Sequence, residues 1–205
     1  MNTIQAKQVV YDGINFRSKL EARWYFFMKN LGWNIEYEPH MENIFGWIPD
    51  FLILGDETKI LVEVKPFQIS SDFNSDYALQ TIEKIKNSLQ NIKIDAVLLV
   101  GSSLNLKPAS CGGGFSFVGG KIIREAHPEE EENFYDDYFS YTDSPGGRFR
   151  IGVCDECRSY GDVINNSYDG GYDLDEENKD FIYECWNRAG SELQWKPERE
   201  LYEME

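Results

Sequence analysis

Four side chains in the N-terminal part of the chain have the chemistry that metal-assisted hydrolysis of a phosphate diester requires. They are the carboxylates Glu21, Asp50 and Glu63 and the amine Lys65. Carboxylate oxygens suit Mg²⁺, which keeps most of its water and binds through one or two carboxylates together with substrate phosphate. A lysine beside such an ion either has a depressed pKa and helps to deprotonate the attacking water, or stays charged and stabilises the transition state. Both roles of Lys65 remain open.

The segment 59–65 predicts a strand that carries two of these groups on one face. Its sequence is Lys-Ile-Leu-Val-Glu-Val-Lys, a β-branched run whose side chains alternate between the two faces of a sheet. Glu63 and Lys65 therefore project together, while Val62 and Val64 face a core.

Asp50 opens a second apolar run, over residues 51–54. The turn residues 55–58 predict a hairpin between the two runs, and a hairpin brings Asp50 back towards Glu63. The alternative is a solvated strand face on which the carboxylates and Lys65 form an ordinary salt bridge.

Glu21 lies in a predicted helix that begins near Ser18 and ends before Gly32. The apolar stripe of this helix consists of Leu20, Trp24, Phe27 and Leu31. Glu21 is at the margin of the stripe, from which it could face Asp50 along the sheet edge. Ser18-x-x-Glu21 is also a capping box, in which the Glu21 carboxylate merely bonds back to the Ser18 amide.

The joint order is a helix with Glu21, a strand, a strand that begins Pro49-Asp50, and a strand with Glu63-x-Lys65. This order resembles the PD-(D/E)XK nuclease superfamily. The segments 11–24 and 36–39 are similar to small phage and bacterial, TnsA-like members of that superfamily.

The resemblance covers roughly residues 8–100 and implies a metal-dependent deoxyribonuclease that uses Mg²⁺ or Mn²⁺. It implies that Asp50 and Glu63 are metal ligands, with the Val64 carbonyl as a further ligand. It also implies that Lys65 is the catalytic lysine and Glu21 an accessory acid.

The next elements are a predicted helix over 75–91 and a predicted buried strand over 94–100. The apolar side of this helix is predicted to consist of Leu79, Ile82, Ile85 or Lys86, and Leu89. A strand–helix–strand crossover should be right-handed and place this last strand parallel to the Glu63 strand. We therefore expect an α/β fold with an αβββαβ, restriction-endonuclease-like core around a mixed central sheet, over residues 1–105.

A glycine-rich break over 102–121 predicts a loop or hairpin, after which residues 106–205 form an acidic, aromatic-rich α+β extension. A helix in this extension is predicted to begin at Asp173-x-x-Glu176 and to close at Arg188 and Gly190. Its apolar stripe is Leu174, Phe181, Ile182, Cys185 and Trp186.

The net charge of −16 is distributed unevenly. Residues up to Lys107 include 11 basic and 13 acidic side chains, and the remainder include 9 and 23, so the two parts carry −2 and −14. A DNA-binding protein this acidic needs its basic residues gathered locally. The candidates are Arg17, Lys19 and Arg23 around Glu21, and Lys84 and Lys86 on the second helix. The alternative is ordinary solvated helix faces.

Four cysteines offer a second candidate metal centre. Cys154-x-x-Cys157 has the spacing of half a zinc knuckle, and Cys111, Cys185 and His127 could complete it. A second close pair is absent from the sequence. Reduced structural thiols, a zinc site and a redox pair therefore all remain open.

Length and composition limit the remaining possibilities. With 205 residues, 41% of them hydrophobic, the chain can form one substantial core and a small second one. It has no apolar run near the ~20 residues of a membrane span and no signal-peptide profile, so we expect no membrane partner and a cytoplasmic location, in the host cell if a phage encodes it.

Two functions of different classes follow. The first is a Mg²⁺-dependent DNA endonuclease, which would act as a homodimer or by two successive nicks to cut both strands. The second is a protein-binding module on a nuclease fold, a DNA mimic or anti-defence inhibitor that uses its acidic half, residues 108–205, to bind a protein partner. A blend, in which the acidic half restrains the nuclease, is also open.

Overall fold

The computed structural model describes most of the first half of the chain and several segments of the second. The described residues are 8–42, 44, 46–55, 59–68, 76–89, 94, 96–108, 115–123, 139–143, 149–155, 158–162 and 176–193. Side chains are described within 8–104 and 180–193.

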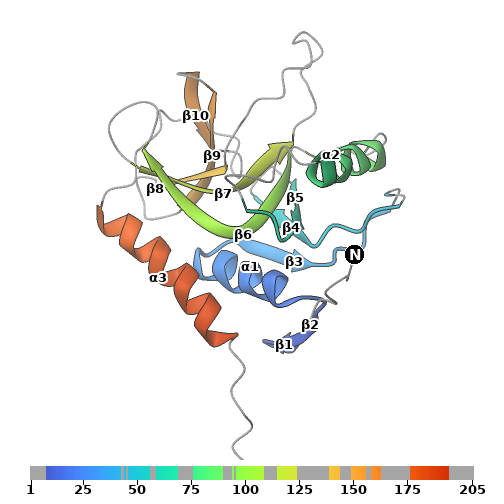
Figure 1. The fold of residues 1–205 in the computed structure, drawn as a ribbon, viewed down its shortest axis with the longest axis horizontal. Helices are drawn as coiled ribbons and strands as arrows, with labels where there is room; N and C mark the ends of the chain where they lie inside the picture. Colours follow the sequence, from blue (N-terminus) through green and yellow to red (C-terminus); the bar gives the residue numbers. More distant parts are fainter. Residues whose placement is uncertain are drawn as a thin grey trace, which may run out of the picture.

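The central element is a five-stranded mixed sheet with the strand order β3-β4-β5-β6-β7 (Figure 1). Its strands are β3 (Asn34–Tyr37), β4 (Phe51–Leu54), β5 (Lys59–Val64), β6 (Ala96–Pro108) and β7 (Phe115–Ile123). β5 and β6 pair in parallel, while the other neighbours are antiparallel. The predicted mixed α/β class, the hairpin of the second and third core strands and the parallel crossover to β6 are therefore confirmed.

In the described part of the chain, three helices flank this sheet: α1 (Lys19–Asn30), α2 (Asp76–Ser88) and α3 (Glu176–Glu192). Alternate residues of the strands pack on opposite faces, because strand side chains alternate. Phe51 and Val62 join the core cluster that contains α1 and α3, whereas Leu52 and Leu61 join the cluster that contains α2. Figure 1 accordingly shows α1 and α2 on opposite sides of β4 and β5.

The local signals of α1 act as expected. The Ser18 side chain accepts a hydrogen bond from the Glu21 amide, and Gly32 follows the Leu31 cap with φ +80°, a left-handed backbone that glycine adopts without strain. Trp24 and Phe27 are fully buried. Burial extends around the helix to Tyr25, Phe26 and Met28, because α1 packs against the sheet, α3 and a small hairpin.

That small hairpin pairs β1 (Val9–Tyr11) with β2 (Ile14–Phe16). Its two-residue turn is Asp12-Gly13, and both residues have positive φ, at 52° and 76°. An Asp-Gly pair between two short apolar runs is a strong hairpin signal, so this hairpin was predictable from the sequence.

The α2 stripe differs from the predicted one. The buried apolar side chains are Ala78, Ile82 and Ile85, whereas Leu79 is 50% exposed. Spacings of four and three residues keep the first three on one face, and Leu79 points about 100° away from Ala78.

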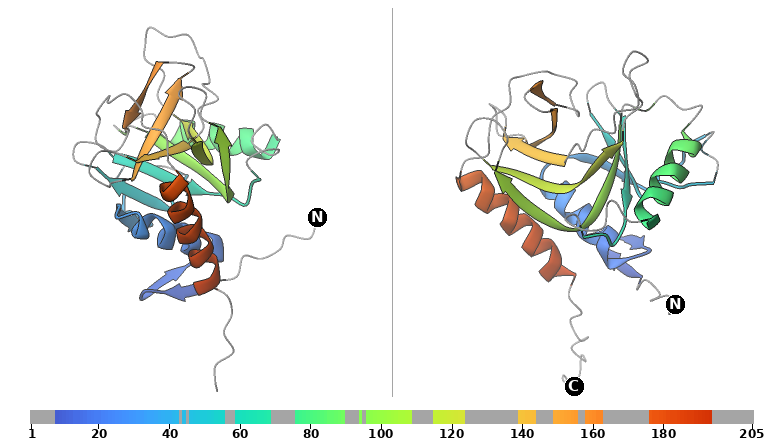
Figure 2. Two further views of the ribbon diagram at one scale, coloured as in Figure 1. Left: turned by 90° about the vertical axis from the view of Figure 1, so that its left-hand side faces the viewer. Right: turned by 45° about the horizontal axis from the view of Figure 1, so that its top comes forward.

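The described residues of the second half also include a small second sheet and the helix α3. β8 (Phe139–Asp143), β9 (Phe149–Asp155) and β10 (Arg158–Asp162) form a three-stranded antiparallel sheet, and this sheet lies beside β7 (Figure 2). α3 runs along α1, and its residues Ile182 and Trp186 join the α1 core cluster.

The helix was predicted to close at Gly190, but α3 continues to Glu192. Gly190 has a packing role instead, since a Cβ at this position would lie 3.1 Å from Arg23 Nη2. The predicted division at residue 105 stays a prediction; in the described part of the chain, β6 crosses that position. No helix among the described residues is long and apolar enough to cross a membrane.

Candidate active site

The predicted carboxylates meet at the ends of β4 and β5, in a cleft of about 610 Å³ that is bordered by α1, α2 and the segment before β4. The lining residues are Arg17, Glu21, Ile44, Gly46, Trp47, Ile48, Asp50, Glu63, Lys65 and Lys84. The β4–β5 hairpin brings Asp50 close to Glu63, because the Asp50 N–H donates to the Val62 carbonyl and so continues the pairing of the two strands.

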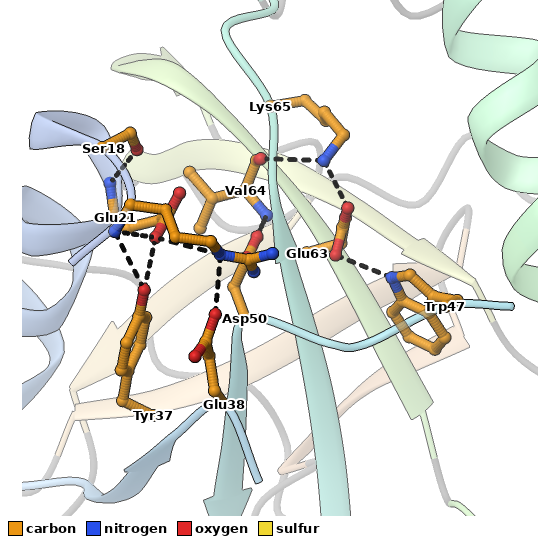
Figure 3. Close-up of polar contacts among 10 residues, drawn as sticks. Ser18, Glu21, Tyr37, Glu38, Trp47, Asp50, Glu63, Val64 and Lys65 are labelled. Atoms are coloured by element: carbon orange, nitrogen blue, oxygen red, sulfur yellow. Dashed lines mark hydrogen bonds and ion pairs between the residues drawn. The ribbon is translucent and has the colours of Figure 1, made fainter. Parts of the chain in front are cut away.

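Glu63 is a buried carboxylate with a donor on each oxygen. Its Oε1 accepts a hydrogen bond from Lys65 Nζ, as expected for two side chains on one strand face. Its Oε2 lies 2.7 Å from Trp47 Nε1, and the Trp47 side chain is itself buried (Figure 3). The two donors fix the plane of the carboxylate towards the cleft.

Asp50 is also buried, and its two oxygens have different partners. Oδ2 accepts a 2.7 Å hydrogen bond from the Val64 amide, and Oδ1 lies 2.6 Å from Arg17 Nη2. Burial and repulsion from Glu63 raise the pKa of Asp50 to about 7, although the Val64 amide lowers it. The site therefore keeps a carboxylate in a place where its charge is costly.

Lys65 is a cation in this arrangement. Burial alone would lower the pKa of Lys65, but attraction to Glu63 and the hydrogen bond between them outweigh that effect and raise it. Lys65 Nζ also lies 3.4 Å from the Val64 carbonyl. Of the two roles left open by the sequence, these contacts favour the charged lysine.

Glu21 combines the two roles considered for it. Its amide completes the helix cap at Ser18, while its carboxylate lines the cleft. The carboxylate does not bond back to Ser18 but accepts from the Arg17 amide at 3.1 Å and from the Tyr37 hydroxyl at 2.8 Å. Burial, together with Glu21, raises the pKa of Tyr37 to about 12, so the phenol stays a donor.

Arg17 connects these groups. Its Nε lies 2.6 Å from Glu38 Oε1, and its Nη2 reaches Asp50. Glu38 has φ +46°, a left-handed backbone that costs a non-glycine residue about 1–2 kcal/mol, and its amide donates to the Asp50 carbonyl. Strain of this kind persists where the surrounding contacts outweigh it.

The donor atoms of the cleft fit a hard divalent cation. Asp50 and Glu63 supply carboxylate oxygens, and the Val64 carbonyl lies beside them in the close-up (Figure 3). In the part of the chain that the structure describes, no three His, Cys, Asp or Glu side chains are grouped to hold a metal by themselves. Mg²⁺ needs only one or two protein carboxylates, so this donor set is compatible with it.

The predicted basic residues separate into two groups. Arg17 and Lys84 line the cleft. Lys19 and Lys86 are outside the lining, and Arg23 lies on the α3 side of α1, with its guanidinium 3.9 Å from the centre of the Trp186 ring. Arg23 also donates to the Trp186 carbonyl, and burial lowers its pKa. The structure thus brings two of the five candidates to the site.

Most of the candidate zinc ligands lie outside the residues that the structure describes. Cys111, Cys157 and His127 lie outside the described residues, and Cys154 is described only as backbone in β9. Cys185 is a buried, free thiol in the α1–α3 core, and burial raises its pKa. A raised thiol pKa disfavours the thiolate that binds metal, which supports the structural-thiol interpretation for Cys185.

Three contributors to the site were not assigned from the sequence. Trp47 orients Glu63, Tyr37 orients Glu21, and Glu38 holds Arg17. Tyr37 and Glu38 belong to the 36–39 segment on which part of the family resemblance rests, so a signal for them was present. No local pattern marks Trp47 as a partner of Glu63.

Comparisons with protein-family models, with curated proteins and with solved structures found no match to this chain.

Proposed function

We propose that this protein is a divalent-metal-dependent endonuclease that hydrolyses phosphodiester bonds in DNA. One observation carries the proposal: the buried carboxylates of Asp50 and Glu63 and the ammonium of Lys65 converge at the ends of two paired strands and line one cleft. Buried titratable groups gathered in a cleft are costly to a fold and are typical of catalytic sites.

We also propose that the order α1-β3-β4-β5-α2-β6 is a PD-(D/E)XK nuclease core, with the acidic second half as its extension. Support comes from the parallel β5–β6 pairing and from the antiparallel β4–β5 hairpin that carries Asp50 and Glu63. DNA, rather than another phosphodiester, follows from the family resemblance of residues 8–100.

The residues of the cleft have separate roles in this mechanism. Asp50, Glu63 and the Val64 carbonyl would hold Mg²⁺ or Mn²⁺, which supplies Lewis-acid chemistry for the phosphate and activates the attacking water. Lys65 stays charged and stabilises the negative charge that builds on the phosphate as water attacks and the P–O bond breaks. Trp47 keeps the Glu63 carboxylate in one orientation.

The test is incubation of the purified protein with supercoiled, linear, single-stranded and branched DNA in Mg²⁺ or Mn²⁺. We expect metal-dependent cleavage. Asp50→Asn should lower the cleavage rate at least ~100-fold, because one ligand oxygen is lost, and Lys65→Ala should abolish cleavage. Asp12→Asn is the matched control, since it makes the same change at an exposed ion pair outside the cleft. Cleavage that survives at Asp50→Asn and Lys65→Ala would reject the mechanism.

The charge distribution supports a second candidate, a protein-binding module of the DNA-mimic or inhibitor class. The −14 charge of the residues after Lys107 is unfavourable for DNA binding and favourable for a basic protein partner. Absence of cleavage on every DNA form, together with salt-sensitive binding of a basic DNA-binding protein, would favour this candidate.

A further inference from the structure

The Arg17 side chain is a cation that lies among the carboxylates of the cleft. Its guanidinium contacts Asp50 Oδ1 and Glu38 Oε1 at 2.6 Å each, and its Nε is 4.0 Å from Glu21 Oε2. One positive charge therefore faces three carboxylates. The most buried of these three carboxylates is Asp50, which is also one of the proposed metal ligands.

The two partners of the Arg17–Asp50 pair differ in exposure. The Arg17 side chain is 49% exposed, whereas the Asp50 side chain is 5% exposed. Arg17 is therefore the accessible partner of the pair, whereas Asp50 is covered. Guanidinium is also the side chain best suited to phosphate, because its planar fork donates two parallel hydrogen bonds to two oxygens.

The backbone of Arg17 is held independently of its side chain. The Arg17 amide donates to Glu21 Oε2 and to the Tyr37 hydroxyl at 3.0 Å. Glu38, which is 38% exposed at its side chain, lies on the solvent side of the pair and offers the guanidinium a second carboxylate. The guanidinium can thus leave Asp50 and remain in the cleft.

We propose that Arg17 is a phosphate-binding residue that exchanges Asp50 for a backbone phosphate of the substrate when a divalent cation binds Asp50. The proposal rests on the proposed function and deepens it. A divalent cation held by the Asp50 carboxylate would repel the Arg17 guanidinium, which lies 2.6 Å from Oδ1 of the same carboxylate. Metal binding thereby releases Arg17 for the phosphate that the metal site needs.

The first test is calorimetric titration of Mg²⁺ and Mn²⁺ into the DNA-free protein at about pH 8. Arg17→Gln removes the competing charge, so we expect roughly tenfold tighter metal binding than in the wild type. Lys29→Gln is the matched control, because it removes a lysine that pairs with Asp12 outside the cleft and should leave metal affinity unchanged. Equal or weaker metal affinity in Arg17→Gln would overturn the exchange.

The second test is binding of a short DNA duplex in Ca²⁺, measured over a series of salt concentrations. Loss of one phosphate contact in Arg17→Gln should weaken binding and reduce the slope of log K against log salt by about one. Lys29→Gln should keep the wild-type slope. An unchanged slope in Arg17→Gln would mean that Arg17 does not bind phosphate.

Arg17→Lys serves if Arg17→Gln does not fold. Lysine keeps the charge but lacks the fork that bridges Asp50 and Glu38, so we expect metal affinity to rise by about two- to threefold and the duplex to bind more weakly. Metal affinity at or below the wild-type value would reject the exchange. Failure of the proposed function looks different, because then wild type and Asp50→Asn would both show no metal binding.

Discussion

Two arginines near the start of α1 mark two regions that surround buried charge with different partners. Arg17 lies at the cleft among carboxylates, and its main partner, Asp50, has a pKa raised to about 7. Arg23 lies at the α1–α3 contact, over the Trp186 ring and within hydrogen-bonding distance of the Trp186 carbonyl. Both regions bury charge at a cost, but the cleft gathers carboxylates that repel one another, whereas the α1–α3 contact places a single guanidinium against an aromatic face and a carbonyl oxygen.

If the proposed function is correct, this difference separates groups kept for chemistry from groups kept for folding. Removing a charge that the fold tolerates at a cost should stabilise the protein, and removing a charge that packing uses should destabilise it. The three substitutions below test that contrast, in order of decreasing expected effect.

The largest effect is expected for Asp50→Asn as pH rises. The folded-state pKa of Asp50 is raised above its unfolded value near 3.8, so the folded state binds the proton more tightly and wild-type stability falls as pH rises from about 4 to about 7. Relative to the wild type, the variant should gain roughly 2–3 kcal/mol in free energy of unfolding between pH 5 and pH 8, measured by denaturant titration without metal.

Asp12→Asn is the control for this pH series. The hydrogen bond from Lys29 lowers the pKa of Asp12, so its contribution is present at neutral pH and is lost as pH falls through the folded-state pKa. The two aspartates therefore predict opposite pH trends. If Asp50→Asn shows no gain at high pH, the carboxylate is not destabilised in the fold and the contrast between the regions fails.

Arg23→Ala should act in the other direction. Loss of the Trp186 stacking and of the hydrogen bond to its carbonyl should lower the free energy of unfolding by about 1–2 kcal/mol. Denaturant titration measures the loss, and calorimetry should find Mg²⁺ affinity unchanged, because Arg23 is outside the cleft lining. A change in metal affinity without a change in stability would reverse the roles assigned to the two arginines.

The smallest effect is expected for Gly190→Ala. Alanine in the interior of α3 gains up to about 1 kcal/mol in helix propensity, but its Cβ would lie 3.1–3.3 Å from the Arg23 guanidinium, which must then shift. We expect the two contributions to leave stability within about 0.5 kcal/mol of wild type. In an Arg23→Ala background, Gly190→Ala should show its full gain in the free energy of unfolding. If the effects of the two substitutions on stability simply add, Gly190 is not needed to accommodate Arg23.

The local sequence was sufficient for the elements that carry the site. Alternation along β5 placed Glu63 and Lys65 on one face and Val62 in the core, and the helical stripe and glycine cap located α1. These features depend on neighbours within a few residues, whose spacing directly determines the face on which each side chain lies.

The same local patterns gave wrong predictions where two faces of a helix are similarly apolar, because packing against the sheet decides which face is buried. Leu79 fits a helical stripe as well as Ala78 does, but the sheet surface buries Ala78. Glycine is typical of a helix end, yet α3 continues through Gly190 to Glu192, and Arg23 occupies the space where a side chain at this position would lie.

By itself, the sequence determined the strand face with its carboxylate and lysine, the hairpin that returns Asp50 to Glu63, and the parallel crossover to β6. Only the tertiary structure decided that Trp47 orients Glu63, that Arg17 pairs with Asp50 and Glu38, and that Arg23 belongs to α3. Strand alternation, turn residues and the order of the elements predict the first group. The second group consists of single side-chain contacts, which depend on how the helices, strands and loops pack against one another.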